Sequence, residues 1–215
     1  MSTTEIQAAL EADAPEKPTR RPTRQERAEK TRMKILRAAA KVVGQYGYAD
    51  ASIGRITEAA NIAQGTFYLY FKSRQELFDV LLPYVGRDML EFIREKVRGA
   101  ASYYEVEERG FRAFFGYLLK NPGFVRVLNE AEVAAPAAHA EHMRVLSEVY
   151  VKSLQRSIDN GEIRSFAPEE LETVAYIFQG ARSYLYLCHI KGKNRKKLPE
   201  SVVQTYMKLV RDGLA

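Results

Sequence analysis

Residues 51–78 constrain the fold more than any other stretch, because they contain two helix-sized pieces separated by a short break. Ser52 is a residue type favoured at helix N-caps, and apolar residues follow it at helical spacing. The pattern breaks at Asn61, and a second short helix follows through Gly65 and Phe71. Two short helices separated by a turn of about four residues form a helix-turn-helix, whose second helix lies in the DNA major groove. This stretch therefore predicts a DNA-binding unit.

The second piece, QGTFYLYFKSRQELF at residues 64–78, divides into a buried and an exposed face. Phe67 and Phe71 are four apart, so they share one face of a helix and can pack inward. The polar and tyrosine side chains of this piece, Gln64, Thr66, Tyr68 and Tyr70, then point toward solvent or nucleic acid. Gly65 lets the backbone approach a neighbouring surface closely. Three helices with an aromatic core and no nucleic acid would explain the two phenylalanines, but not this second face flanked by cations.

The same stretch resembles the DNA-binding domain of the TetR family of bacterial transcriptional regulators. The resemblance covers residues 31–82, and its most specific part is the Gly-Thr-Phe-Tyr-x-Tyr-Phe-Lys-Ser core at residues 65–73. In the family the turn usually carries Gly where this chain has Asn61. Asn also tolerates the left-handed conformation that such a turn needs.

The predicted DNA-binding site combines residues with three roles. Gln64 can read adenine bidentately and Thr66 can touch a thymine methyl, so both are expected at base edges. Ser52 caps the first helix and places its N-terminal amides near the DNA backbone. The resemblance implies that the tyrosines and cations hold phosphates. The full set is Ser52, Gln64, Gly65, Thr66, Tyr68, Tyr70, Lys72 and Arg74.

Positive charge is concentrated directly before the helix-turn-helix. The whole chain of 215 residues has a formal net charge of +6. Residues 17–41 carry ten Lys or Arg against the two acids Glu26 and Glu29, a local net of +8 that exceeds the whole-chain excess. Such a block is the electrostatic footprint expected of a DNA-binding protein. Residues 1–24 are polar with several prolines, and we expect a disordered basic arm that either follows DNA or remains a solvated tail.

The remaining sequence predicts helices throughout, and therefore an all-α fold. It contains no strand-like alternation, internal repeat or phosphate-binding glycine motif. We expect a three-helix helix-turn-helix domain at residues 25–82 and a C-terminal helical domain at residues 83–215. Gly47 should stop the first helix, and Ser73 with Glu76 forms a capping box that opens a long connecting helix. Helices are expected at about 25–46, 52–60, 64–70, 74–97, 105–120, 124–133, 136–160, 168–190 and 199–212.

The C-terminal domain lacks a motif of comparable specificity, so its role rests on the resemblance, which implies ligand binding and dimerisation. In the family the last two helices pair with their twins, and Gly180 and Ala181 would permit close approach there. The alternative is that both helices face only their own core. A pocket for a small effector is expected between the helices of this domain. Its candidate walls are Phe111, Phe115, Phe124, Leu128, Tyr150, Tyr176 and Arg182.

Arg182 is the candidate that most needs an explanation, because its charge interrupts an otherwise apolar and aromatic helix. A buried guanidinium needs a partner. That partner is expected to be an internal carboxylate such as Glu130 or Glu132, or an anionic ligand. Exposure of the guanidinium to solvent is the remaining alternative.

Other classes of protein find little support in the sequence. His139 and His142 could place two imidazoles on one helix face, but a third metal ligand is not evident and exposure in an Ala-rich turn is the simpler interpretation. We therefore expect no enzyme, no metal and no cofactor. No apolar run is long enough to span a bilayer, and the single cysteine, Cys188, fits a reducing cytoplasm. An architectural DNA-binding protein would have the same basic block, but no reason for a separate helical domain.

The sequence as a whole predicts a homodimeric, ligand-responsive repressor that a small apolar or aromatic effector releases from a palindromic operator. An operator with two half-sites requires a protein with two-fold symmetry. The residues leave open whether the effector releases or promotes DNA binding.

Overall fold

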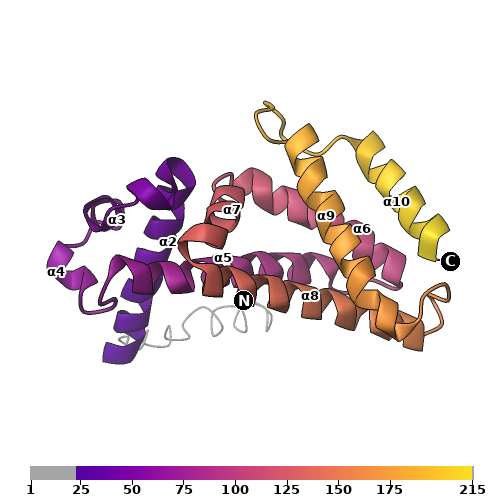
Figure 1. Ribbon diagram of the computed structural model, residues 1–215, viewed down its shortest axis with the longest axis horizontal. Helices are drawn as coiled ribbons and strands as arrows, with labels where there is room; N and C mark the ends of the chain where they lie inside the picture. The colour runs from indigo at the N-terminus through magenta and orange to yellow at the C-terminus, as the bar shows by residue number, and fades with distance from the viewer. Residues whose placement is uncertain (1–22, 215) are drawn as a thin grey trace, which may run out of the picture. The chain divides into compact units, whose positions relative to one another are not determined.

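The computed structural model describes residues 23–214, and these residues fold into helices without a strand (Figure 1). The predicted all-α fold is confirmed for this part of the chain. Residues 1–22, most of the predicted basic arm, lie outside it. The described residues divide into two compact units after Met33, within the first helix. The helices are α2 (Arg24–Asp50), α3 (Ile53–Ala59), α4 (Gln64–Phe67), α5 (Arg74–Val97), α6 (Tyr103–Lys120), α7 (Phe124–Ala134), α8 (Pro136–Asp159), the 3-10 turn η1 (Pro168–Glu170), α9 (Leu171–His189) and α10 (Glu200–Leu214).

The first unit contains the start of α2, which is closed by a reciprocal cap. The Thr23 N–H donates to the Glu26 carboxylate over 2.6 Å, and the Glu26 N–H donates to Thr23 Oγ1 over 3.1 Å. These two bonds satisfy amides that the first turn of a helix leaves without partners.

The second unit begins with the rest of α2, whose regular part ends where the sequence predicts. Gly47 has a φ of 84°, a left-handed value that glycine adopts without strain, and it kinks the helix before Asp50. The inner face of α2 packs on the aromatic side chains that follow α3. Buried members of this cluster are Ile35, Leu36, Ala39, Val42, Val43, Ile56, Phe67 and Phe71.

α5 begins at the predicted cap, although the reciprocal bond differs. Ser73 Oγ accepts the Glu76 N–H over 3.1 Å, whereas the Glu76 carboxylate accepts the N–H of Lys72, one residue earlier than a capping box requires (2.6 Å). The helix continues through Pro83, which lacks a backbone donor. Three residues later, at Gly86, the space that a Cβ would fill is occupied by the imidazole of His142 from α8.

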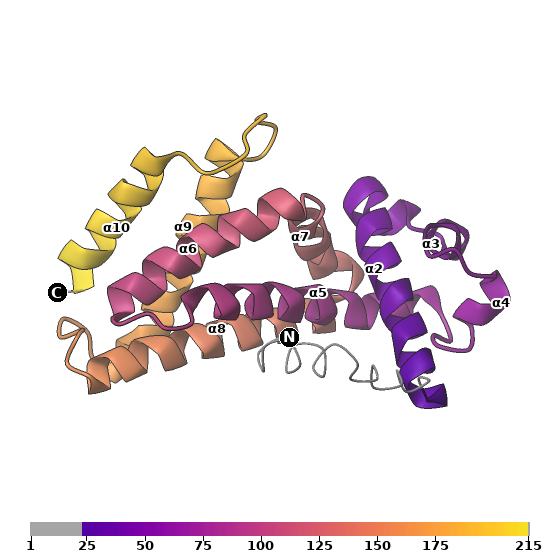
Figure 2. The ribbon, with the colours of Figure 1, turned by 180° about the vertical axis from the view of Figure 1, so that it is seen from behind.

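Three long helices form the centre of the C-terminal part. α5 packs against α6 and α8, and the three lie side by side in both views (Figures 1 and 2). α9 packs on α8, and α10 packs on α6. The core between them is rich in aromatic residues, and Phe111 stacks on Tyr206 with ring centroids 3.9 Å apart.

α2 and the start of α7 approach each other backbone to backbone. A Cβ built on Gly44 would lie 2.7 Å from the Cα of Gly123, and a Cβ on Gly123 would lie 2.7 Å from the Cα of Gly44. Real Cβ atoms do not approach this closely, so each position requires glycine.

The last two expected helices differ from the sequence-based expectation at their boundaries. The helix expected at residues 168–190 is divided into η1 and α9, because the Glu170 side chain accepts the Ala167 N–H (2.8 Å) and closes a tighter first turn. The last helix runs to Leu214 rather than ending near Asp212. In the part of the chain that the structure describes, no helix is long and apolar enough to cross a membrane.

Candidate nucleic-acid interface

The helix-turn-helix is built from local contacts that the sequence encodes. Ser52 Oγ accepts the Arg55 N–H over 3.2 Å and so caps α3, as predicted. Asn61 has a φ of 46°, the single left-handed residue other than glycine among those described. Lys34 Nζ donates to the Asn61 carbonyl over 3.4 Å, which ties the turn to α2.

α4 is shorter than predicted. The regular helix covers Gln64–Phe67 instead of reaching Tyr70. The N–H groups of Leu69 and Tyr70 donate to carbonyls three residues back, those of Thr66 and Phe67. Bonds of this type tighten the last turn, so the backbone stays helical in direction while regular α-helix ends.

Phe67 and Phe71 fix the orientation of this segment. Both side chains are buried, and their ring centroids lie 5.7 Å apart. The predicted inward face is therefore present, and of the residues between the two phenylalanines it leaves Tyr68 and Leu69 exposed, whereas Tyr70 is partly buried.

The predicted DNA-binding residues differ in how much of each is accessible. Thr66 and Tyr70 are partly buried, and Tyr70 packs against the core, while Tyr68 is 51% exposed. The exposed members are Ser52, Gln64, Gly65, Tyr68, Lys72 and Arg74. Ser52 caps α3, Gln64, Gly65 and Thr66 lie on α4, and the other members lie between α4 and the first residue of α5, so the whole set belongs to the helix-turn-helix and the start of the next helix.

Two arginines beside this face also hold the backbone of α2. Arg74 donates to the Ala49 carbonyl (3.1 Å) and lies over the Phe78 ring. Arg55 donates to the Asp50 carbonyl (3.0 Å). Cations near the last carbonyls of a helix stabilise that end. The sequence interpretation missed Arg55, although its position three residues after the Ser52 cap could have indicated it.

α7 joins the helix-turn-helix to the C-terminal part through polar bonds. Arg126 donates to the Gln45 carbonyl over 2.7 Å, and the Glu130 carboxylate accepts the Tyr48 N–H over 2.8 Å. Partial burial opposes ionisation of Glu130, but its bonds to Arg126 and the Tyr48 N–H outweigh this effect and lower its pKa. We call this set the α2–α7 junction: Gly44, Gln45, Tyr48, Gly123, Arg126 and Glu130.

Arg182 lies at the centre of a buried polar cluster that spans four helices. Its guanidinium donates to Glu107 of α6 over 2.6 Å and to the hydroxyl of Tyr150 on α8 over 2.7 Å. Glu107 also accepts the hydroxyls of Tyr150 and of Tyr206 on α10, each over 2.5 Å. The expected partners Glu130 and Glu132 are therefore wrong. Glu130 instead belongs to the α2–α7 junction.

Arg182 keeps its positive charge although the cluster is buried. Burial alone would lower the pKa of Arg182, but Glu107 and the nearby tyrosines raise it, so the guanidinium stays protonated. Burial raises the pKa of Tyr150 well above its ordinary value, so its hydroxyl stays neutral. Two buried donors, Arg182 Nε and the Tyr103 hydroxyl, have no hydrogen-bond partner in the structure.

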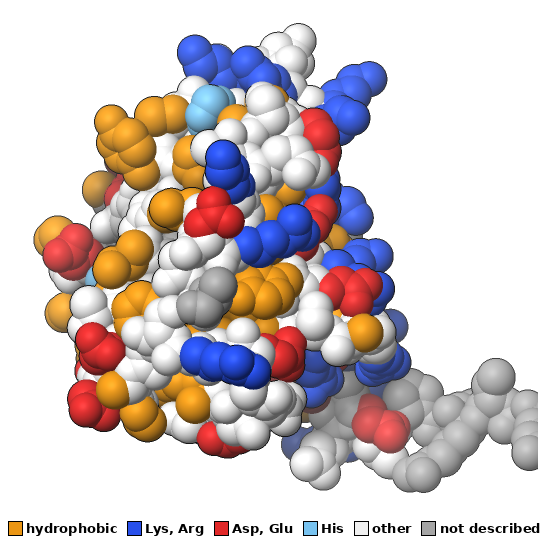
Figure 3. Space-filling model, turned by 90° about the vertical axis from the view of Figure 1, so that its right-hand side faces the viewer, with side chains coloured by type: hydrophobic (Ala, Val, Ile, Leu, Met, Phe, Trp, Pro, Cys, Tyr) orange, Lys and Arg blue, Asp and Glu red, His pale blue; other side chains and the backbone are white. Residues whose placement is uncertain are grey.

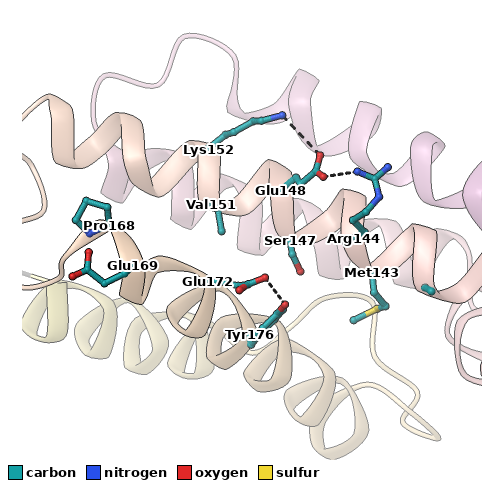
Figure 4. Close-up of a pocket in the computed structure, with 11 residues that line it drawn as sticks. Met143, Arg144, Ser147, Glu148, Val151, Lys152, Pro168, Glu169, Glu172 and Tyr176 are labelled. Atoms are coloured by element: carbon teal, nitrogen blue, oxygen red, sulfur yellow. Dashed lines mark hydrogen bonds and ion pairs between the residues drawn. The ribbon is translucent and has the colours of Figure 1, made fainter.

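The predicted effector residues occupy two different environments. Tyr176 is 52% exposed and lines an open groove of about 710 Å³ between α8 and the η1–α9 segment (Figure 4). Charged side chains share this groove, among them Arg144 and Glu148, which form an ion pair. The remaining candidates lie in or against the core of the domain and not in this groove: Phe111, Phe115, Phe124, Leu128, Tyr150 and Arg182.

His142 is buried, which corrects the expectation of an exposed histidine. His142 is 4% exposed, and its imidazole ring packs in a T-shaped arrangement with the Phe124 ring, with centroids 6.3 Å apart. Burial, together with a smaller effect of His139, lowers its pKa to about 4. Among the described residues, no group of three or more potential ligands is placed to hold a metal ion.

α9 carries a second apolar face that points away from its own core. Ile177, Tyr184 and Leu187 are 61%, 68% and 45% exposed, and Gly180 between them has open space around it. Figure 3, in which the right-hand side of Figure 1 faces the viewer, shows exposed hydrophobic side chains interspersed with charged ones.

Comparison with known proteins gives results that agree with this geometry. Residues 35–81 match the family model described as bacterial regulatory proteins, tetR family. The HTH-type transcriptional regulator YhgD of Bacillus subtilis is 26% identical over 139 residues, which cover 63% of this chain and 73% of that protein. The HTH-type transcriptional repressor NicS of Pseudomonas putida is 27% identical over 167 residues, which cover 76% of this chain and 78% of NicS.

A solved structure shares the fold over most of the chain. The transcriptional regulator FadR from Bacillus subtilis, solved in complex with stearoyl-CoA, aligns with a TM-score of 0.70 and 18% identity, covering 85% of this chain and 99% of FadR. YhgD is named as an HTH-type transcriptional regulator and NicS as an HTH-type transcriptional repressor. The family match shows a tetR-family DNA-binding domain at residues 35–81, and the relatives and the shared fold show that the whole chain is similar to transcriptional regulators of that family.

Proposed function

We propose that this regulator is a homodimeric repressor that a small effector releases from a palindromic operator. The observation that carries the proposal is the accessible polar face of α4, anchored by the buried Phe67 and Phe71 and flanked by exposed cations. Such a face suits the major groove, where an operator half-site is read.

Within the operator, different residues have different roles. Gln64 and Thr66 meet base edges, and Gly65 lets the backbone come close. Ser52 presents the start of α3 to the DNA backbone. The phosphates are held by Tyr68, Tyr70, Lys72 and Arg74.

The second copy of the chain pairs through α9 and α10. The exposed apolar face of α9 supports this assignment, because Ile177 and Tyr184 would be buried by a partner helix. Gly180 leaves room for close approach.

The effector binds between the helices of the C-terminal domain. Candidate contacts are Phe111, Phe115, Phe124, Leu128, Tyr150, Tyr176 and Arg182, a set that favours an apolar or aromatic molecule. An acyl thioester is one candidate, because the structural neighbour FadR is described with stearoyl-CoA. Glu107 already neutralises Arg182, so the polar group of the effector is expected to be an uncharged acceptor for the free donors rather than a carboxylate.

The α2–α7 junction supports a route between the two sites. α7 packs on α8 of the effector domain and is bonded to the end of α2. An effector that displaces α7 would change the spacing of the two recognition helices in the dimer. The coupling is reciprocal, so the operator must weaken effector binding by the same factor.

The test is selection of bound sequences from a random duplex library at physiological salt, with the bound stoichiometry read by mass. A repressor enriches a palindrome that is occupied by dimers. Absence of enrichment, with binding that vanishes as salt rises, would instead indicate an architectural DNA-binding protein.

Two variants then separate base reading from phosphate binding. Gln64→Ala should relax the preference at one base pair of each half-site. Lys72→Ala should weaken all sequences about equally and flatten the salt dependence by about one phosphate contact. Uniform loss of affinity in both variants would contradict the assignment of Gln64 to a base edge.

A further inference from the structure

Leu69 is an aliphatic side chain exposed in the middle of the candidate DNA-binding residues. It is 79% exposed, more than Tyr68 beside it, and it lies two residues after the last residue of α4. Single exposed leucines are common on protein surfaces and carry no functional meaning by themselves. The position of Leu69 within the helix-turn-helix is what makes it informative.

The direction of Leu69 follows from the backbone around it. Its N–H donates to the Thr66 carbonyl over 3.2 Å, and the Phe71 N–H donates to the Phe67 carbonyl over 3.0 Å, so the chain follows a helical path through this segment. Phe67 and Phe71 point inward, and Leu69 is two residues from each of them. In a helical path a residue two positions away lies on nearly the opposite side.

Leu69 shares this outward side with Gly65, four residues earlier. A Cβ at Gly65 would meet no protein atom within 4 Å. The backbone at Gly65 and the side chain of Leu69 are therefore the parts of this segment most directly opposed to the buried phenylalanines.

We propose that Leu69 contacts the methyl group of a thymine in each operator half-site. This inference rests on the proposed role of α4 in the major groove. The edges of the bases in that groove present hydrogen-bond donors and acceptors, and the C5-methyl of thymine is the one apolar group among them. A leucine cannot bond to a base edge or a phosphate, so the methyl is the group there that it fits. Leu69 thus specifies thymine at one position, independently of the polar side chains.

The size of the effect follows from the group that is removed. Replacing the thymine by deoxyuridine deletes one methyl and leaves every hydrogen-bonding group in place. Loss of one buried methyl is expected to weaken binding about four-fold. The same loss should disappear when the leucine side chain is shortened.

The experiment uses the full-length dimer and the operator obtained from the library selection. Each thymine of one half-site is replaced in turn by deoxyuridine, and the dissociation constant is measured at fixed salt. For the natural protein, one replacement should weaken binding about four-fold. Leu69→Ala should bind the thymine and deoxyuridine duplexes equally at that position.

Two further variants test whether a different side chain produces the thymine preference. Thr66 also carries a methyl, so Thr66→Ser is measured in parallel, and it must retain the thymine preference at the Leu69 position. Val149→Ala, which shortens a half-exposed side chain on α8, should bind both duplexes as the natural protein does.

The outcomes distinguish this inference from the function on which it rests. Suppose that the natural protein binds the selected operator tightly and that Leu69→Ala binds it more weakly but still prefers thymine to deoxyuridine. Leu69 would then contact deoxyribose rather than the methyl group, and the inference would be overturned. Loss of the preference in Thr66→Ser alone would overturn it as well. Failure to select any operator would instead remove the proposed function, and the thymine contact with it.

Discussion

The buried imidazole of His142 predicts how the stability of this protein depends on pH. Burial, with a smaller effect of His139, lowers its pKa from 6.5 to about 4. Unfolding exposes the side chain, so the unfolded chain takes up a proton near pH 6.5 that the folded chain does not accept until about pH 4. The stabilising contribution is therefore fully present above pH 6.5 and is lost as the pH falls from there toward 4.

The magnitude follows from these two values. The difference between 6.5 and about 4 corresponds to about 3 kcal/mol of unfolding free energy when the titration is complete. By about pH 5, about 2 kcal/mol of this should already be lost. A loss of this size is a large fraction of the stability of an ordinary domain.

Urea unfolding of the natural protein and of His142→Leu at about pH 7.5, 6 and 5 measures this contribution. Leucine cannot titrate, and the substitution breaks no bond of Nε2, which has no partner in the structure. Titrating groups elsewhere are common to both proteins and cancel in the difference. The variant should gain about 2 kcal/mol relative to the natural protein between about pH 7.5 and 5.

His139→Asn is the matched control, because it removes only the lesser influence on the pKa of His142. It should keep most of the pH dependence of the natural protein. If the natural protein and His142→Leu lose stability in parallel as the pH falls, the argument from burial is wrong.

Two other substitutions test packing and charge in the same way. Gly123→Ala would place a Cβ against the backbone of Gly44, which cannot move aside as a side chain can, and should lower the unfolding free energy by about 1–3 kcal/mol in a urea titration. Gly116→Ala, in the open part of α6, should be neutral or stabilising by up to about 1 kcal/mol, and equal effects at both sites would refute the clash. Arg182→Met should cost about 3–5 kcal/mol because it leaves Glu107 buried without its cation. Adding Glu107→Leu should restore most of that loss, and a double variant as unstable as the single one would show that the charge is not the cause.

Local chemistry explains what could be predicted from the sequence. Ser52 and Ser73 cap helices because a hydroxyl placed before a helix meets a free amide within three residues. Asn61 adopts its left-handed conformation in the turn where the apolar pattern breaks. Such features depend on neighbouring residues, so the helix-turn-helix and the all-helical fold were readable without the structure.

Partners distant in the sequence could not be predicted in this way. Arg182 was expected to need a carboxylate, but Glu107 lies 75 positions away, on a helix whose rotation is set by packing in the C-terminal domain. Helical spacing indicates which face of a helix is apolar, but it does not show which helix meets that face. The burial of His142 against Gly86 could not be predicted for the same reason, since each residue taken alone is ordinary in its own helix.

The contact of Gly44 with Gly123 limits how α2 and α7 can move against each other. No side chain lies between the two backbones, so a change of rotamer cannot relieve a clash at this point. Sliding of α7 along α2 would bring Cβ atoms of adjacent residues into collision, whereas rotation about the glycine pair would not. We therefore expect the glycine pair to favour a change of angle over sliding when α7 shifts against α2.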